Sequence, residues 1–176
     1  MSAGNIKKTL CAMAVIVGIV VGTHTELRTS KQGLEHIFDV EGCRSKAYQC
    51  SANKWTIGVG HASNVSQEQT VTNQEIADYY AMDIKTAEST VDKLVKVPVA
   101  QYQYDMFVSF VFNLGSGNFS RSTMLKRINE NNIVAACNEF PKWVYVNRKN
   151  CNDKESNCYG IVHRREIEKN ICLNGY

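Results

Sequence analysis

The stretch Glu41–His61 constrains this 176-residue chain more than any other. It carries three reactive groups at fixed spacing: the carboxyl group of Glu41, the thiol of Cys50 and the hydroxyl of Thr56. A Gly-x-Gly-His run ending at His61 closes it. Such a pattern predicts a helix that ends at the carboxyl group and a turn-rich β segment after it.

The helix before this stretch has a clear local signature. Three apolar side chains have the i, i+3, i+4 spacing of a buried helical face: Leu34, Ile37 and Phe38. Ser30 is a suitable N-cap, and Gly42 is a suitable C-terminal stop. Glu41 would then lie in the last turn, where the negative end of the helix dipole favours a carboxyl group that keeps a proton to donate.

After Glu41 the pattern favours a β-hairpin, with strand-like residues 46–48 and 55–57 around a polar turn at 51–54. A proton-donating carboxyl group that faces a second reactive group is the usual arrangement for cleaving a glycosidic bond. Taken one at a time, Glu41, Cys50 and Thr56 have plainer interpretations: a surface carboxylate, a buried or disulfide-bonded cysteine, and an ordinary strand residue.

The spacing Glu41-x8-Cys50-x5-Thr56 resembles that of the phage-type lysozymes, in which the middle residue is usually Asp and sometimes Cys. Two later stretches, Phe112–Asn129 and Gly160–Glu166, resemble the family's central helix with its following segment and its paired-arginine signature. The likeness spans about residues 31–173. It implies an α+β, mainly helical, lysozyme-like two-lobed fold, in which the long Thr72–Val97 helix joins a small β-hairpin lobe to a larger helical lobe.

The resemblance also implies an activity, namely hydrolysis of the β-1,4 bond between N-acetylmuramic acid and N-acetylglucosamine in peptidoglycan held between the lobes. Glu41 would protonate the leaving oxygen, while Cys50, as a thiolate, and Thr56 would position and activate water. Asn113 is a further candidate for substrate binding. No metal ion and no organic cofactor is implied, and we expect a monomer.

Local patterns predict the remaining helices. Thr72-x-x-Glu75 is a capping box that opens a helix running towards Pro98. The other expected helices are Tyr104–Leu114, Ser120–Asn129, Ile133–Phe140 and Gly160–Cys172, with an exposed loop at Asn147–Tyr159. Arg164 and Arg165 on the last helix are expected to bind structural carboxylates rather than substrate.

Charge gives a weak argument about partners. The formal net charge is +3, and residues 120–176 contain ten basic and six acidic side chains. An excess of basic side chains in the C-terminal part of the chain suits an anionic polymer, so nucleic acid is an alternative binding partner to the cell wall. No nucleic-acid-binding motif supports that alternative, and we expect no nucleic-acid partner.

Residues 1–25 have the pattern of a membrane-directed segment. Lys7 and Lys8 precede the uncharged run Thr9–Thr25, so the N-terminus should stay in the cytoplasm. The run has no convincing cleavage site. It is also short for a permanent membrane anchor, and its alanine, glycine and threonine residues lower its hydrophobicity. It resembles the signal-arrest-release segments of some phage endolysins, and a plain signal peptide is the alternative. The catalytic domain would be residues 26–176, tethered by residues 9–25 to the host inner membrane on its periplasmic side and then released into the periplasm.

Seven cysteines indicate disulfides in an oxidising compartment, because their spacings do not fit zinc sites. We expect Cys137–Cys172 to tie two helices together and Cys151–Cys158 to close the polar loop. Sequence alone does not fix connectivity, and pairing of Cys151 with Cys137 or Cys172 is the alternative.

The other three cysteines resemble those of the thiol-switched branch of the signal-arrest-release endolysins. In the tethered form Cys43 would pair with Cys50. After release Cys11 would attack Cys43, giving Cys11–Cys43 and a free Cys50. The alternative is that Cys11 is only a small apolar residue.

Two other functions are consistent with parts of the sequence. One is a membrane-tethered wall-binding protein in which Cys50 is structural. The other is a cysteine hydrolase that uses Cys50 and His61, although no local signature and no third orienting group supports it.

Overall fold

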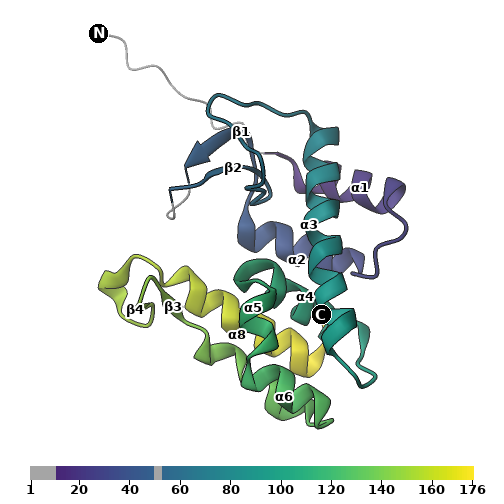
Figure 1. The fold of residues 1–176 in the computed structure, drawn as a ribbon, viewed down its shortest axis with the longest axis vertical. Coiled ribbons are helices and arrows are strands. Elements are labelled where there is room, and N and C mark those ends of the chain that lie inside the picture. The colour runs from purple at the N-terminus through teal and green to yellow at the C-terminus, as the bar shows by residue number, and fades with distance from the viewer. Residues whose placement is uncertain (1–10, 50–52) are drawn as a thin grey trace. The chain divides into compact units, whose positions relative to one another are not determined.

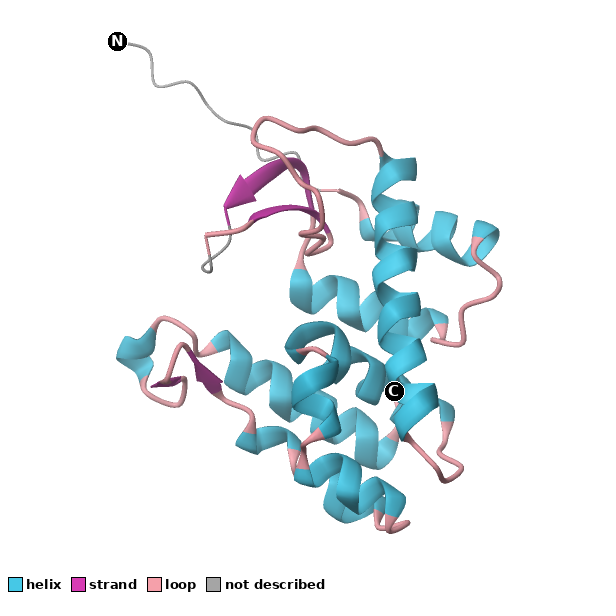
Figure 2. Cartoon of the chain, viewed as in Figure 1, coloured by secondary structure: helices cyan, strands magenta, loops and turns pink. Residues whose placement is uncertain are grey.

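The computed structural model describes residues 11–49 and 53–176 (Figure 1). The chain is mainly helical with two small antiparallel hairpins (Figure 2), which confirms the predicted α+β, mainly helical class. It forms two compact units. The hairpin unit is the chain up to Leu27 together with Leu34–Asp83, and the helical unit is Arg28–Gly33 together with Ile84–Tyr176.

The hairpin unit is built on three helices and one hairpin. These are α1 (Met13–Thr23), α2 (Lys31–Glu41), β1 (Arg44–Gln49), β2 (Trp55–Gly58) and the first half of α3 (Asn73–Leu94). Each helix, and β2, contributes fully buried aliphatic side chains: Ile16, Val20, Ile37, Ile57 and Ile76. A two-stranded hairpin is marginal in water, so these helices supply the apolar surface that holds it.

Helix α1 is the apolar N-terminal segment folded as an 11-residue helix. Ile16, Val17 and Val20 are at most 1% exposed, so one face of the helix belongs to the core. Just after the helix, Nε2 of His24 lies 3.0 Å from Oδ1 of Asp78 in α3. No helix in the described ranges has the length and apolar content needed to cross a membrane.

Helix α3 starts at the predicted capping box. The hydroxyl of Thr72 accepts the amide hydrogen of Glu75 at 3.3 Å, and the Glu75 carboxylate accepts that of Thr72 at 2.8 Å. The Thr72 amide and the Thr72 hydroxyl both donate to the Glu75 carboxylate, and these two bonds lower the pKa of Glu75. The helix ends at Leu94, earlier than the Val97 that we predicted.

The helical unit contains the second half of α3 and all later elements. These are α4 (Gln101–Leu114), α5 (Ser116–Ser120), α6 (Thr123–Asn129), α7 (Ile133–Cys137), η1 (Phe140–Lys142), β3 (Tyr145–Val146), β4 (Lys149–Asn150), η2 (Lys154–Ser156) and α8 (Gly160–Asn174). Helix α4 is buried along most of its length and packs on α8. Phe110 of α4 contacts the rings of Phe119, Phe140 and Trp143, so these aromatic side chains form the centre of the unit.

Other predicted helix boundaries also differ from the structure, and α4 starts at Gln101 rather than at Tyr104. The predicted Ser120–Asn129 helix starts only at Thr123, because Ser122 is its N-cap and accepts the amide hydrogen of Leu125 at 3.0 Å, whereas Ser120 is the last residue of α5. The predicted Ile133–Phe140 helix ends at Cys137, and Pro141 lies at the start of the short η1 helix. Proline has no amide hydrogen to donate, so it is favoured at the start of a helix. The predicted loop Asn147–Tyr159 includes strand β4.

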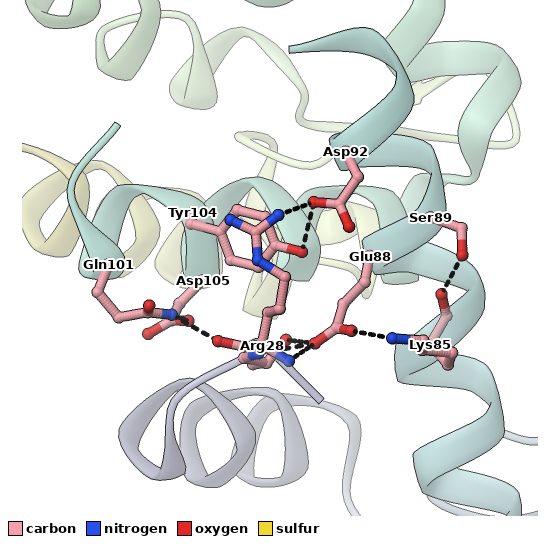
Figure 3. A network of polar contacts seen from close by, with 9 residues as sticks. Arg28, Lys85, Glu88, Ser89, Asp92, Gln101, Tyr104 and Asp105 are labelled. Atoms are coloured by element: carbon pink, nitrogen blue, oxygen red, sulfur yellow. Dashed lines mark hydrogen bonds and ion pairs between the residues drawn. The ribbon is translucent and has the colours of Figure 1, made fainter. Parts of the chain in front are cut away.

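Within the helical unit, two fully buried carboxylates hold the segment Arg28–Gly33 in place (Figure 3). One Glu88 oxygen accepts the amide hydrogens of Arg28 and Thr29, both at 2.7 Å, and the Thr29 hydroxyl at 2.8 Å. Asp105 accepts the amide hydrogen and the hydroxyl of Ser30. The first residues of α2 are therefore fixed by carboxylates that come much later in the chain.

Three disulfides join Cys11 to Cys43, Cys137 to Cys172 and Cys151 to Cys158. These are the same pairs that we expected from the sequence and the resemblance. The first connects Cys11, two residues before α1, to Cys43, directly before β1, so it fastens the N-terminal segment within the hairpin unit.

Candidate active site

Glu41 is the last residue of α2 and is partly buried. Ser30 caps the helix by accepting the amide hydrogen of Gly33 at 3.1 Å, as predicted. At the other end Gly42 has φ +71° and donates its amide hydrogen to the carbonyl of Phe38 at 2.9 Å. A residue with a side chain is strained at this φ, so glycine ends the helix directly after the carboxyl group.

The apolar face of α2 fixes the backbone that carries Glu41. Leu34, Ile37 and Phe38 are 5% exposed or less, which confirms the predicted helical face. The ring of Phe38 meets that of Tyr80 edge to face at 6.2 Å, and the Tyr80 hydroxyl donates to the Leu34 carbonyl at 2.7 Å. The end of the helix is thus held on α3 by both packing and a buried hydrogen bond.

Thr56 lies on β2, opposite Tyr48 of β1. It is 4% exposed, and its hydroxyl donates to the Lys54 carbonyl at 3.2 Å. The hydroxyl oxygen keeps a lone pair that can accept a further hydrogen bond. The pairing register shifts between Arg44 and Tyr48, which is the mark of a bulge that re-aims side chains on the strand.

Of the two cysteines in this stretch, the structure describes only Cys43. Cys43, two residues after Glu41, is buried and bonded to Cys11. Cys50, the proposed thiolate, lies outside the described residues, as do Ser51 and Ala52 of the predicted turn.

His61 is a structural residue of the hairpin unit. Its Nδ1 lies 2.9 Å from Oδ2 of Asp83, and its Nε2 lies 3.0 Å from the Ser63 carbonyl. The ring stacks on Tyr79 at 4.5 Å and is 4% exposed. Burial raises the pKa of Asp83, and the hydrogen bond and charge of His61 oppose that rise. Both ring nitrogens are engaged, which argues against His61 as the base of a cysteine hydrolase.

The paired arginines bind a structural carboxylate, as predicted. Glu168 is fully buried and accepts hydrogen bonds from Arg164 (2.9 Å), from Arg165 and from the Ser109 hydroxyl (2.7 Å). Arg165 also donates to the Asn113 side-chain oxygen. Asn113 is therefore oriented by the helical unit, and its role in binding substrate stays a prediction.

Several important carboxylates were missed by sequence reasoning. Asp83, Glu88 and Asp105 bind partners far away in the chain, so no local pattern indicated them. Glu168 had a signal, because it stands three and four residues after the two arginines, the spacing at which helical side chains meet.

Comparison with known proteins agrees with this architecture. The family described as Phage lysozyme matches residues 39–168. An endolysin of Acyrthosiphon pisum secondary endosymbiont phage 1 is 36% identical over 81% of this chain and 96% of its own length. A protein named SAR-endolysin from Bacteriophage PS119 is 30% identical over 93% of this chain and 92% of its own length.

The P1 phage endolysin Lyz has been solved in two forms that this chain resembles to different degrees. Its active form matches with a TM-score of 0.82 at 29% identity, covering 94% of this chain and 96% of that one. Its secreted inactive form matches with a TM-score of 0.55 at 28% identity, covering 84% and 96%. With the family match over most of its length, the chain belongs to the phage lysozyme family and is a glycoside hydrolase of the lysozyme (muramidase) type.

Proposed function

We propose that this protein is a phage endolysin that hydrolyses the β-1,4 bonds between N-acetylmuramic acid and N-acetylglucosamine in peptidoglycan and so lyses the host cell. Glu41 protonates the leaving oxygen. Cys50, as a thiolate, and Thr56 position and activate the attacking water. The fixed end of α2 supports the role of Glu41, because a general acid must be held in one place relative to the scissile bond.

The enzyme is exported as an inactive form tethered to the inner membrane by residues 9–25, and it is then released into the periplasm. The observation that carries this proposal is the Cys11–Cys43 disulfide at the start of a helix with a buried apolar face. A segment that spanned the bilayer could not also bury Ile16, Val17 and Val20 in the hairpin unit. The greater similarity to the active form of P1 Lyz, and the relative named SAR-endolysin, support the same sequence of events.

Activation follows from thiol–disulfide exchange. In the tethered form Cys43 is bonded to Cys50, and Cys11 lies in the membrane. After release the Cys11 thiolate attacks the sulfur of Cys43, the Cys11–Cys43 bond forms, and Cys50 leaves as a thiolate. One disulfide breaks as another forms, so no external oxidant is needed. The reaction delivers the thiolate that hydrolysis requires.

Turbidity loss of purified peptidoglycan tests the hydrolytic function. Glu41→Gln should fold normally and lose hydrolysis by roughly 100- to 10,000-fold, the usual contribution of general acid catalysis. Asp39→Asn is the matched control, because Asp39 is an exposed carboxylate on the same helix. Near-normal activity of Glu41→Gln would exclude this mechanism.

A further inference from the structure

His24 lies at the C-terminal end of α1, between two carboxylates. Its Nε2 is 3.0 Å from Oδ1 of Asp78 in α3, and its Nδ1 is 3.5 Å from Oε1 of Glu26. Among the residues that the structure describes, these carboxylates are its charged partners, and all three residues belong to the hairpin unit. The His24 side chain is 24% exposed, so water screens these contacts only in part.

The contacts at both ring nitrogens fit the protonated form of His24. An ionised carboxylate can only accept hydrogen bonds, and a neutral imidazole has a donor on one nitrogen and a lone pair on the other. In the neutral form, one ring nitrogen would therefore direct a lone pair at a carboxylate oxygen. The imidazolium ion has a donor on each nitrogen, so it can interact favourably with Asp78 and Glu26 at the same time.

The backbone at His24 also favours a positive charge. His24 is the C-cap of α1, and its amide hydrogen bonds to the Val20 carbonyl at 2.8 Å. The C-terminal end of a helix carries a partial negative charge, which attracts a cation. The sequence of α1 contains no charged side chain that could oppose this effect.

Asp78 in turn depends on His24 for a positive partner. Its other described contact is a hydrogen bond from Nε2 of Gln74 at 2.9 Å, and within the described ranges no lysine or arginine pairs with it. Glu75, three positions earlier on α3, adds a second negative charge close to Asp78. Loss of the His24 proton would therefore leave several negative charges together without a cation between them.

The contact at His24 differs in kind from the other attachments of α1. The Cys11–Cys43 disulfide holds the chain just before the helix, and the buried apolar face holds its middle. Neither attachment carries a charge. Histidine gains or loses its charge between about pH 5 and 8, so the attachment at the end of α1 is sensitive to pH in that range.

We propose that His24 is a proton-dependent clasp that fastens the end of α1 to α3. With the imidazole protonated, His24 attracts Asp78 and Glu26, and when the proton is lost to solvent that attraction ends. Packing of the N-terminal segment onto the hairpin unit therefore takes up protons, because the two carboxylates favour the charged form. This stabilisation is present in mildly acidic solution and is lost as the pH rises.

The consequence for the enzyme rests on the proposed release from the membrane. The clasp forms only when the segment has left the bilayer and packed on α3. Mild acidity then favours the released form, and a higher pH favours the tethered one.

Urea denaturation of the purified released protein tests the clasp without a membrane. His24→Gln removes the charge and keeps a polar side chain. The unfolding constant of the variant should exceed that of the wild type at about pH 5.5, and the ratio should fall about two- to fivefold by about pH 8, the usual effect of a partly exposed ion pair. Other titrating groups are common to both proteins and cancel in the ratio. His163→Gln is the matched control, because His163 is an exposed histidine in the helical unit, and its ratio to wild type should not change with pH.

Asp78→Asn tests the partner of His24. It should remove most of the pH-dependent stabilisation, and the double variant with His24→Gln should lose little more, because both changes remove the same interaction. Glu26→Gln should have a smaller effect, since its contact with His24 is longer. An equal ratio of wild type to His24→Gln at both pH values, or additive effects of the His24 and Asp78 changes, would overturn the clasp.

Fractionation of spheroplasts, in which the medium bathes the exported side of the membrane, tests the effect on release. More wild-type protein should leave the membrane at about pH 6 than at about pH 8, and the distribution of His24→Gln should be the same at both. A membrane-bound wild-type fraction that does not change with pH would overturn the effect on release. If the denaturation result holds but no protein is ever membrane-bound, the proposed tethering is rejected and the clasp is supported.

Discussion

Gly33 lies so close to Asp105 that a methyl group on Gly33 would come within 2.7 Å of the Cγ atom of Asp105. Asp105 is fully buried and is bonded to Ser30, three residues before Gly33. The start of α2 therefore packs backbone against side chain, with no space for a larger residue.

Gly33→Ala should destabilise the protein by about 1–3 kcal/mol, because a well-packed site must shift to admit the added carbon. Urea denaturation measures the effect. Gly160→Ala is the control, since a methyl group there meets nothing within 4 Å and Gly160 is also near the start of a helix. Equal stability of the two variants would contradict the close packing at Gly33.

Tyr104 should make stability fall in alkaline solution. Burial, with the nearby Glu88 and Asp92 carboxylates, raises the pKa of Tyr104 well above its usual range. Above about pH 10 the unfolded chain releases this proton while the native protein keeps it. The unfolded state then binds fewer protons, so the free energy of unfolding decreases as pH rises.

Tyr104→Phe should remove this contribution, and the slope of unfolding free energy against pH above about 10 should become shallower by up to one proton. Denaturation curves of both proteins between about pH 8 and 11 measure it. Parallel slopes would show that Tyr104 ionises alike in the native and unfolded states.

The thiol switch predicts opposite behaviour for two serine variants. Cys11→Ser should be exported but stay inactive until a reductant frees Cys50, because Cys43–Cys50 has no thiol to resolve it. Cys43→Ser should be active while still tethered, because Cys50 has no partner. Lysis after induction, with and without reductant, distinguishes them.

Removing the Cys151–Cys158 bridge by a double serine change is the control for the switch, and it should leave the reductant dependence unchanged. Full activity of Cys11→Ser without reductant would end the exchange mechanism.

Release from the membrane should depend on the weak apolar character of α1. Gly18→Leu with Gly22→Leu should keep the protein in the membrane fraction, because leucine favours insertion. A Cβ at either glycine meets nothing within 4 Å, so α1 can still pack in the hairpin unit. Fractionation of cells measures the distribution, and mass spectrometry of the released wild-type protein should find residues 1–25 still attached. A mature start near Glu26 would identify an ordinary signal peptide.

Local signals predicted those parts of the fold whose partners are close in sequence. The Ser30 cap, the Thr72–Glu75 capping box and the Gly115 stop of α4 each involve groups within four residues of one another. The predicted helix began at Ser120 rather than at Thr123, because Ser120 and Ser122 are equally suitable residue types for a helix start, and only the bond from the Leu125 amide to the Ser122 hydroxyl decides between them.

The candidate site likewise combines residues that local sequence signals predicted with residues that they did not. The fixed helix end that carries Glu41 followed from spacing and from Gly42. The His61–Asp83 pair, 22 positions apart, and the Glu88–Thr29 bond, 59 positions apart, depend on tertiary packing that no local window contains. Roles for Cys50 and Thr56 came from the family pattern, since single residues of these types carry no specific signal.

The two carboxylates that bind residues 28–30 also impose an order on biosynthesis. The ribosome makes Thr29 and Ser30 59 and 75 positions before Glu88 and Asp105, respectively. Until Asp105 has been made, the helix that ends in Glu41 lacks the carboxylate that binds its N-cap residue, Ser30. A chain that ends before Asp105 therefore carries all the reactive groups of Glu41–Thr56 without one of the two carboxylates that fix the start of their helix.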